Sequence, residues 1–330
     1  MTGLPVAITG WATKVPEGRV TNADLEAQVD TNDQWIVERT GIRERRIAAP
    51  DESTATLAVD ACAAAIKRAG LTPDDIDLLI VTSATPEQPL PHTGAFVGDA
   101  LGLRCGSFDL QAACSGFAYS LVVGAAMVGV GYEHVLVVGS ETLSRIMNPA
   151  DRQTLILFGD GAGAAVLSRR AGDAPSILSW DLGCDGASAG ILGIAAGGSR
   201  QPTNPDTVAA GGHYLHMQGQ EVFRRAVRAL VESAQTTLAR ANATPDDVQW
   251  FVPHQANLRI IDAVGARLGI PRERTVVNIE RFGNTSTASI PLTLFEHVDN
   301  GYVRDGDLVL MSAFGAGVTW ASVLLRWGSA

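Results

Sequence analysis

The stretch Ala69-Gly-Leu-Thr-Pro-Asp-Asp-Ile-Asp-Leu-Leu-Ile-Val-Thr82 recurs in the second half of the chain as Ala241-Asn-Ala-Thr-Pro-Asp-Asp-Val-Gln-Trp-Phe-Val-Pro-His254. Each copy has the pattern of a helix end, a turn and a buried strand. Apolar residues at helical spacing precede both copies, over residues 57–65 and 223–238. The match therefore indicates one α/β unit used twice, rather than a short solenoid repeat.

The two halves also continue alike after this stretch. A Leu-Gly turn follows at residues 101–102 in the first half and 268–269 in the second. Strand-like apolar runs come next, at residues 135–138 and 308–311, and each leads into a turn that contains glycine. The order of elements is therefore duplicated well beyond the matching letters.

This duplication predicts the fold class. Continuous apolar strands are typical of sheets that helices cover on both faces, and two such halves would share a central helical layer. We predict an α/β fold with two duplicated halves, residues 1–172 and 173–330, joined at the turn-rich segment 170–175.

Composition limits the class of protein. The 330 residues are 46% hydrophobic and 18% charged, as in a globular protein, and a net charge of −10 argues against a nucleic-acid partner. The first residues lack the pattern of a signal peptide, so we expect a cytoplasmic protein. The longest apolar stretch, Phe117–Tyr132, is rich in glycine and favours a buried helix over a membrane span. Four cysteines without C-x-x-C spacing predict neither a disulfide framework nor a metal site.

Three residues lie at the ends of predicted elements: Cys114 in AACSGF, His254 in PHQAN and Asn284 in FGNTSTAS. Cys114 precedes the buried helix, where the helix dipole is expected to lower its pKa. His254 could act as a base or as a hydrogen-bond donor, and an amide such as Asn284 suits an oxyanion. Cys114 and Asn284 follow their Leu-Gly turns similarly, so we expect all three residues to meet between the halves.

Each residue also has an ordinary structural interpretation. Cys114 could be a small buried apolar residue, His254 a structural histidine and Asn284 a turn former. Their coincidence favours acyl transfer through a cysteine thioester. The turn Phe314–Gly317, with the backbone N–H of Cys114, could supply the oxyanion hole.

The sequence also offers two alternative functions. Papain-like cysteine peptidases also have Cys, His and Asn in this order, but their signature around the cysteine is absent here. A dinucleotide site could use Gly159-x-Gly161-x-x-Ala164 after the strand-like run LILF, with Asp181 beyond it. The segment that follows Ala164 is too short for the crossover helix that such a site requires.

Five motifs in this order resemble the thiolase superfamily and, within it, the β-ketoacyl-[acyl carrier protein] synthase III family. They are Asp33-Gln-Trp-Ile-Val-Glu-Arg-Thr-Gly-Ile-Arg-Glu-Arg-Arg46, Ala113-Cys-Ser-Gly116, Phe158-Gly-Asp-Gly-Ala-Gly163, His254-Gln-Ala-Asn-Leu-Arg259 and Gly283-Asn-Thr-Ser286. The resemblance covers essentially the whole chain. It implies a five-layer αβαβα sandwich, a homodimer and no cofactor other than the substrates acyl-CoA and malonyl-acyl carrier protein.

The resemblance also implies roles for individual residues. Cys114 would be the nucleophile, with His254 and Asn284 holding the malonyl thioester carbonyl, and the amides of Cys114 and Ala316 would form the oxyanion hole. Residues implied near CoA are Trp35, Arg39, Arg152 and Asn257. Residues implied in carrier-protein docking are Gln255, Ala256, Asn257, Leu258, Arg259, Arg224 and Arg267. Leu90 and Phe314 would line the acyl pocket.

Some positions depart from the family pattern. Ala316 stands where many members have glycine, Leu90 stands where some have phenylalanine, and Ala266-Arg267 replaces a pair of basic residues. These departures leave the primer and the strength of docking open. A starter synthase of secondary metabolism with the same fold remains an alternative, whereas the complete trio disfavours an inactive scaffold. Arg43, Arg45 and Arg46 are expected to form an ordinary solvated charge run.

Overall fold

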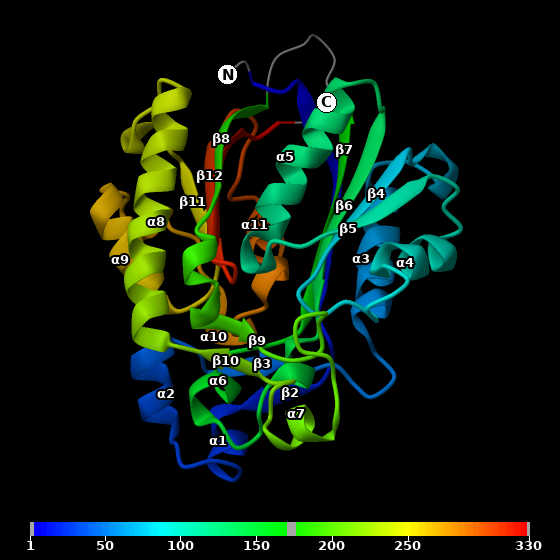
Figure 1. Ribbon diagram of the computed structural model, residues 1–330. Helices are drawn as coiled ribbons and strands as arrows, with labels where there is room; N and C mark the ends of the chain where they lie inside the picture. Colours follow the sequence, from blue (N-terminus) through cyan, green and yellow to red (C-terminus); the bar gives the residue numbers. More distant parts are fainter. Residues whose placement is uncertain (1–2, 170–175, 329–330) are drawn as a thin grey trace.

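The computed structural model describes residues 3–169 and 176–328, and two mixed β-sheets form its framework (Figure 1). The first sheet has the order β1-β7-β6-β4-β5, in which β4 is parallel to β5 and β6, while β1 and β7 are antiparallel to their neighbours. Its strands are β1 (Val6–Lys14), β4 (Leu78–Thr82), β5 (Gly106–Leu110), β6 (His134–Glu141) and β7 (Gly161–Arg169). The second sheet has the order β11-β12-β13-β8. Its strands are β8 (Ile177–Cys184), β11 (Trp250–Pro253), β12 (Leu308–Gly315) and β13 (Thr319–Arg326).

Helices form three layers around these sheets (Figure 1). The outer face of the first sheet is covered by α3 (Thr54–Arg68) and α4 (Thr93–Leu101), and that of the second by α8 (Gly219–Arg240) and α9 (Leu258–Leu268). Between the sheets lie α5 (Gly116–Gly129) and α11 (Ser289–Asp299). The predicted α/β fold with a five-layer αβαβα arrangement is confirmed.

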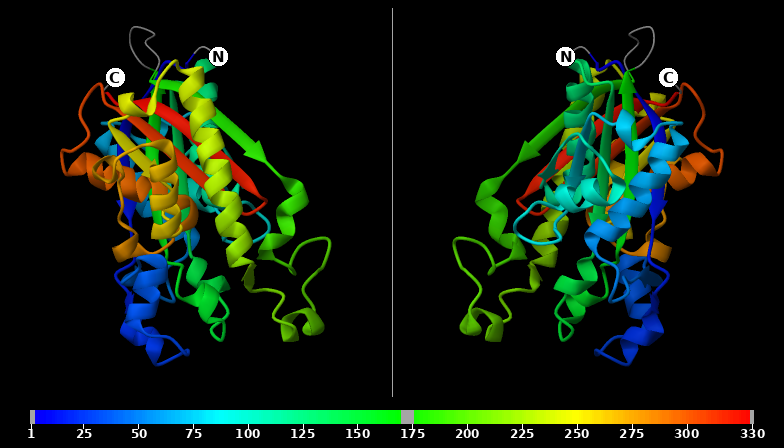
Figure 2. Two further views of the ribbon diagram at one scale, coloured as in Figure 1. Left: turned by 90° about the vertical axis from the view of Figure 1, so that its left-hand side faces the viewer. Right: turned by 90° about the vertical axis from the view of Figure 1, so that its right-hand side faces the viewer.

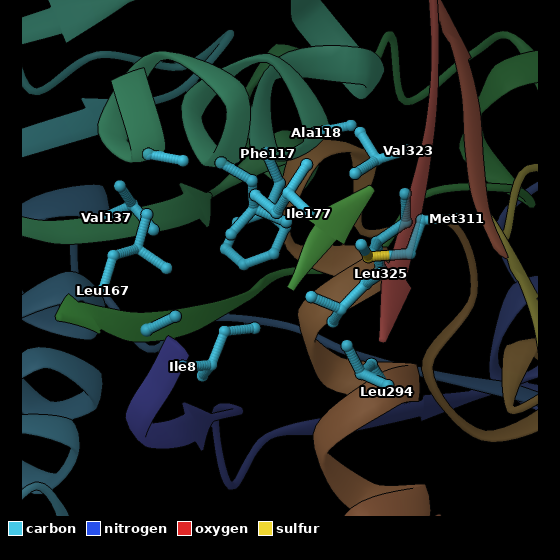
Figure 3. Close-up of a cluster of buried hydrophobic side chains, with 14 of the residues drawn as sticks. Ile8, Phe117, Ala118, Val137, Leu167, Ile177, Leu294, Met311, Val323 and Leu325 are labelled. Carbon is cyan, nitrogen blue, oxygen red and sulfur yellow. The ribbon is translucent and has the colours of Figure 1, made fainter. Parts of the chain in front are cut away.

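The apolar layer between the sheets fixes the two central helices. Phe117 of α5, Val137 of β6, Leu294 of α11 and Met311 of β12 are each 0% exposed and pack in one cluster (Figure 3). Gly116 lets the start of α5 approach β4, because a Cβ there would lie 2.0 Å from Thr82 Oγ1. The predicted buried helix is thus α5, which ends at Gly129, whereas residues 130–132 lie beyond it and Val130 is exposed. Among the described residues, no helix has the length and apolar character that a membrane span needs.

The internal duplication extends to the backbone. Both Thr-Pro-Asp-Asp turns form short 3-10 helices with a capping box, η1 (Pro73–Asp75) and η5 (Pro245–Asp247). Within residues 176–328, the second sheet has no strand equivalent to β5, and the isolated parallel bridge between Phe251 and Thr275 stands in its place. The division predicted between residues 172 and 173 lies outside the described residues.

The duplication matches Cys114 with Thr287, not with Asn284 as the turn spacing suggested. Ala113 and Ser286 both have a left-handed backbone, with φ of 45° and 47°, and each opens a 3-10 helix that leads into a central helix. These short helices are η2 (Ala113–Ser115), before α5, and η7 (Ser286–Ala288), before α11. Cys114 and Thr287 are the middle residues of the two.

A smaller group of elements lies at one end of the sheets, as Figures 1 and 2 show. These elements are α1 (Asn22–Glu26), α2 (Asp33–Thr40), β2 (Arg19–Thr21), β3 (Glu44–Arg46), α6 (Arg152–Leu155), α7 (Pro205–Ala209), β9 (Leu192–Ile194), β10 (Leu215–Met217) and α10 (Ile279–Phe282). Arg45 is 1% exposed here, so its assignment to a solvated charge run is wrong. Its guanidinium donates to Asn22 Oδ1 and to the carbonyl oxygens of Val20 and Ile156, and burial lowers its pKa to about 10.

The dinucleotide alternative is wrong. The run LILF is the end of α6 and a turn rather than a strand, and Gly161–Arg169 is β7 rather than the start of a helix. A phosphate therefore meets no helix N-terminus at this glycine motif. Gly159 serves packing instead, because a Cβ there would lie 2.3 Å from the carbonyl oxygen of Phe282.

Candidate active site

Cys114, His254 and Asn284 line one cavity of about 1140 Å³. Trp35 and Arg152 belong to the same lining, so the cavity joins the trio to the surface near α2 and α6. A second pocket of about 390 Å³ also reaches Cys114 but neither His254 nor Asn284. The thiol therefore lies where the two cavities meet.

Cys114 is held at the start of α5 by the neighbouring strand of the second sheet. A Cβ on Gly315 would lie 2.7 Å from the backbone nitrogen of Cys114, so only glycine permits this close approach. Cys114 is partly exposed as a residue, but desolvation of its thiol raises the pKa to about 12, and the nearby Ser286 hydroxyl opposes this shift by a smaller amount. The expected lowering of that pKa is wrong, because a helix dipole contributes only about 0.3–1 kcal/mol and desolvation outweighs it.

His254 follows β11, and its backbone N–H donates to the carbonyl oxygen of Ser312 at 2.8 Å. The imidazole is 4% exposed, and desolvation lowers its pKa to about 3, so it is neutral at ordinary pH. Its Nδ1 lies 2.6 Å from Ser289 Oγ, which also accepts from the backbone N–H of Gln255 at 3.4 Å. Nδ1 is the one acceptor that the described structure offers to the Ser289 hydroxyl, so we assign this hydroxyl as the donor and the ring hydrogen to Nε2.

The side chain of Asn284 is oriented by its own turn. The backbone N–H of Ser286 donates to Asn284 Oδ1 at 2.8 Å, which leaves the Nδ2 amino group to face the cavity. The backbone of Asn284 is clamped by hydrogen bonds to Leu157 O at 2.8 Å and from Gly159 N at 3.0 Å. Gly283 is required before it, since φ is 64° and a Cβ would lie 2.8 Å from Leu157 O.

Together, His254 and Asn284 present two neutral N–H donors to the cavity that Cys114 lines. Such donors stabilise negative charge on a carbonyl oxygen without titrating near neutral pH. Ala316 lies beside Cys114 in the smaller pocket, and its φ is not in the left-handed region. Alanine therefore fits this turn without strain and retains its N–H.

Two guanidinium groups lie over the ring of Trp35, which lines the larger cavity. Arg39 lies 4.6 Å and Arg152 5.1 Å from the ring centroid. Arg152 also donates to the backbone oxygen of Asp30 at 2.6 Å. The three side chains combine an aromatic ring with two positive charges, a chemistry that suits a purine and its phosphates.

The docking residues implied by the family comprise the segment 255–258 and three arginines. The residues of the segment are buried or half-buried. Gln255 is 1% exposed and its side chain bonds Pro253 O and Asn278 N, so it cannot meet a partner protein. Asn257 lines the cavity, but its amide is used in capping α9 and in bonding Arg39 O. Ala256 and Leu258 flank it in the same segment and are half-buried.

The basic side chains differ in whether they are paired. Arg224 forms an ion pair with Glu221 at 2.7 Å, so its charge is largely compensated. Arg259 and Arg267 lie exposed on α9, and neither has an ion-pair partner among residues 3–169 and 176–328. These two are the uncompensated charges of the implied docking surface.

The implied acyl-pocket residues do not line the smaller pocket in this chain. Leu90 is 83% exposed, and Phe314 lines the larger cavity instead. The sequence did not indicate the residues that do form the pocket, because they come from separate loops. Its apolar lining comprises Ala84, Ala112, Leu143, Ile146, Phe158, Leu192, Ile194 and Leu215.

Sequence reasoning also missed three polar residues around the trio: Ser289, Ser286 and Glu141. Ser286 and Ser289 both lie within FGNTSTAS, but nothing in their spacing indicates that Ser289 contacts His254 or that Ser286 shares a pocket with Cys114. Glu141 is 0% exposed at the end of β6, a strand that contains none of the trio. No group of three or more His, Cys, Asp or Glu side chains with metal-binding geometry occurs in the described part of the chain.

Known proteins share this fold and much of this sequence. The family model of 3-oxoacyl-[acyl-carrier-protein (ACP)] synthase III matches residues 108–186, and that of its C-terminal part matches residues 238–327. The chain is 50% identical to the β-ketoacyl-[acyl-carrier-protein] synthase III of Symbiobacterium thermophilum, with 98% of both chains covered.

Solved structures agree with these matches. The β-ketoacyl-[acyl carrier protein] synthase III of Thermus thermophilus has 46% identity and a TM-score of 0.90, with 98% of this chain and 100% of that chain covered. The priming β-ketosynthase of the R1128 polyketide pathway has 38% identity and a TM-score of 0.91, with 99% of this chain and 98% of that chain covered.

The duplicated five-layer fold and the cysteine that meets two cavities define a thiolase-fold acyltransferase. This excludes the papain-like alternative, whose fold is unrelated. Within that class, the chain belongs to the β-ketoacyl-[acyl-carrier-protein] synthase III family. The resemblance seen in the five sequence motifs is confirmed.

Proposed function

We propose that this protein condenses a short acyl-CoA primer with malonyl-acyl carrier protein, releasing CO₂ and forming 3-oxoacyl-acyl carrier protein through an acyl-Cys114 intermediate. Membership of the family supports the initiating condensation of fatty acid synthesis. The observation that carries the residue assignment is the pair of neutral donors, His254 Nε2 and Asn284 Nδ2, on the cavity that Cys114 lines.

The first half-reaction is acyl transfer. Cys114 sulfur attacks the thioester carbonyl of acyl-CoA, the bond to the CoA sulfur breaks, and the thiol proton ends on CoA. The oxyanion of the tetrahedral intermediate would accept from the backbone N–H groups of Cys114 and Ala316. The acyl chain would then occupy the smaller pocket, which is lined mainly by apolar side chains.

The second half-reaction starts with decarboxylation. The electron pair of the bond to CO₂ moves into the malonyl thioester and generates an enolate oxygen. His254 and Asn284 donate to that oxygen, and because both are neutral, neither can protonate the enolate readily. The enolate carbon then attacks acyl-Cys114, and the cysteine thiolate leaves.

Substrate approach would use the opposite end of the larger cavity. Trp35, Arg39 and Arg152 are suited to the adenine and phosphates of CoA. An acidic carrier protein would be attracted by Arg259 and Arg267, whose charges are uncompensated in the described structure, and less by Arg224, which is paired. A cytoplasmic location, expected from the first residues of the sequence, and a homodimer, implied by the family, remain predictions.

A starter synthase of polyketide metabolism is the second candidate. The similarity to the R1128 priming β-ketosynthase favours it, since that structure covers 99% of this chain. Both candidates share the condensation chemistry and differ in the primer. The pocket of about 390 Å³ would hold a primer of several carbons as well as an acetyl group.

The direct test is reconstitution with purified protein, acyl-CoA primers of increasing length and malonyl-acyl carrier protein. The expected result is 3-oxoacyl-acyl carrier protein with release of CO₂, and the rates across primers separate the two candidates. Cys114→Ala is the matched control and should give no product. Absence of product with every primer would refute the condensation assignment.

A further inference from the structure

The proposed oxyanion hole takes its two N–H donors from different halves of the fold. Cys114 lies in η2, which follows a strand of the first sheet, whereas Ala316 lies in the turn 316–318 between β12 and β13 of the second sheet. Neither N–H donates a backbone hydrogen bond in the part of the chain that the structure describes. Two donors stabilise one oxyanion only if both are held to within about 0.5 Å of the productive geometry, so the two turns must be fixed relative to each other.

Both ends of the turn 316–318 contact the segment that carries the nucleophile. At the first end, a Cβ on Gly315 would lie 3.0 Å from Ala112 O. At the other end, Thr319 Oγ1 lies 2.9 Å from Ala112 O and 2.7 Å from Ser115 Oγ. Gly315 and Thr319 are also opposite each other in the antiparallel pairing of β12 and β13. Close packing at a glycine therefore supplies the first contact, and hydrogen bonds supply the second.

The hydroxyls of Ser115 and Thr319 form a pair that ends on a carbonyl oxygen. Ser115 Oγ lies 2.7 Å from Ala112 O, and Thr319 Oγ1 also lies 3.2 Å from Ala316 O. Each hydroxyl has one hydrogen, so one of the pair donates to the other, and the second donates to a carbonyl oxygen. In either arrangement Thr319 stays bonded to Ser115, which is 0% exposed. The start of β13 is therefore bonded to the residue that follows Cys114.

The turn before the nucleophile needs such a link. Ala113 has a φ of 45°, a left-handed conformation that is unfavourable for alanine and persists only where the surrounding structure holds it. Ala112 O, directly before it, accepts from the backbone N–H of Ser115 at 3.2 Å as well as from the hydroxyl pair. Thr319 lines the smaller pocket together with Cys114 and Ala316. The link therefore lies in the wall of the cavity that would receive the acyl group.

We propose that Thr319 is a positioning residue for acyl transfer, because its hydroxyl, paired with that of Ser115, keeps the N–H groups of Cys114 and Ala316 directed at one oxyanion. This inference deepens the proposed function and rests on it. Thr319 acts through the backbone of the two turns and does not itself donate to the substrate oxygen. His254 and Asn284, which serve the second half-reaction, are held by separate contacts to Ser289 and to the turn at Ser286.

Two reactions of the same thiol test this role. Acyl transfer from acetyl-CoA forms a tetrahedral oxyanion at Cys114, whereas alkylation by iodoacetamide is a direct displacement that forms none. In Thr319→Val, which removes the hydroxyl and keeps the branched shape, acylation should slow by about 10–100-fold, while alkylation should change by less than about twofold. Mass spectrometry of the Cys114 peptide follows both modifications, and exposed Cys184 is the internal reference for alkylation. Thr319→Ser retains the hydroxyl and should be acylated at close to the wild-type rate.

Thr237→Val is the matched control. Thr237 is 0% exposed in α8, and its hydroxyl also donates to a carbonyl oxygen of β13, that of Ser322 at 3.4 Å. It lines neither of the two cavities, so the ratio of acylation to alkylation in this variant should match that of the wild type. Ser115→Ala leaves Thr319 bonded to Ala112 O and should show the same selective loss of acylation to a smaller extent. This second variant provides the test if Thr319→Val does not fold.

Two results would overturn the positioning role. Parallel losses of acylation and alkylation in Thr319→Val would show that the hydroxyl supports the nucleophile in general rather than the oxyanion hole. A wild-type ratio of the two rates in Thr319→Val or in Ser115→Ala would show that the hydroxyl pair does not direct the two N–H groups. By contrast, a wild-type protein that is alkylated at Cys114 but accepts no acyl group from any primer would contradict the proposed function itself.

Discussion

Ser289 Oγ lies 2.6 Å from Nδ1 of His254. With Ser289 assigned as the donor of this hydrogen bond, the ring hydrogen of His254 is on Nε2. The two residues are 35 positions apart, at the end of β11 and at the start of α11. The hydroxyl therefore determines whether the imidazole presents a donor or an acceptor to the cavity. A donor is what a developing enolate oxygen requires.

Replacing this serine should harm one half-reaction selectively. In Ser289→Ala we expect decarboxylation of malonyl-acyl carrier protein to slow by about 10–100-fold, because the tautomer and orientation of His254 are no longer fixed. Acylation of Cys114 should change little. Ser322→Ala, which removes a buried hydroxyl bonded to Ser312, is the control for a general loss of stability. An equal loss of both half-reactions in Ser289→Ala would contradict the positioning role.

Cys114 and Asn284 should separate the half-reactions more sharply. Cys114→Ala should abolish acyl transfer from CoA, whereas Asn284→Ala should retain it and lose on the order of 10² to 10³ in decarboxylation rate. The reason is that Asn284 Nδ2, together with His254 Nε2, would donate to the enolate oxygen, whereas Asn284 Oδ1 accepts from the backbone N–H of Ser286. Quench-flow detection of acyl-enzyme and of released CO₂ distinguishes the steps. If Asn284→Ala blocked acylation as well, this division of labour would be refuted.

The neutral, buried His254 makes stability depend on pH. Its pKa is about 3 in the folded protein and about 6.5 when unfolded, so the unfolded state binds more protons between these values. Stability from this group is therefore present above about pH 6.5 and is lost as pH falls, by about 2 kcal/mol at pH 5. Denaturant unfolding at about pH 5 and at a pH above about 6.5 should show that the wild type loses this stability at the lower pH and that His254→Gln does not. A wild type and variant with the same pH dependence would refute the assignment.

The exposed charges on α9 should govern the carrier protein rather than CoA. Arg259→Glu and Arg267→Glu should each lower kcat/KM for malonyl-acyl carrier protein by about tenfold at low salt, and the effect should weaken as salt rises. Acylation by acyl-CoA should be much less affected by Arg267→Glu. Arg104→Glu, an exposed arginine between α4 and β5 in the other half, is the matched control. Equal effects on both substrates in Arg267→Glu would argue against docking at this surface.

Much of the fold could be predicted because its signals are local. The two copies of Thr-Pro-Asp-Asp form the same capped turn, and the Leu-Gly pairs end helices at Gly102 and Gly269 with φ of 71° and 75°. The equivalence of Cys114 and Asn284 was wrong by contrast. It followed from position after the turns, but the second half inserts α10 (Ile279–Phe282) between its turn and η7, so its matching residue comes later in the chain.

Three predictions about individual residues were wrong because local sequence patterns do not reveal burial. Arg45 looks like part of a charge run but is enclosed, Gln255 looks like a surface residue but is 1% exposed, and Cys114 has a raised pKa rather than a lowered one. In each case the number of neighbours from other elements, rather than the residue's own sequence context, sets the outcome.

The sequence by itself determined the duplicated α/β fold and the identity of the trio, because hydrophobic periodicity and residue type at element ends are properties of short segments. The tertiary structure alone decided what each member of the trio can do. Ser289 makes His254 a donor, the Ser286 turn directs the amino group of Asn284, and buried Glu141 lies near enough to influence the thiol. These relations depend on distance and desolvation, which arise only when the two sheets and the central helices pack together.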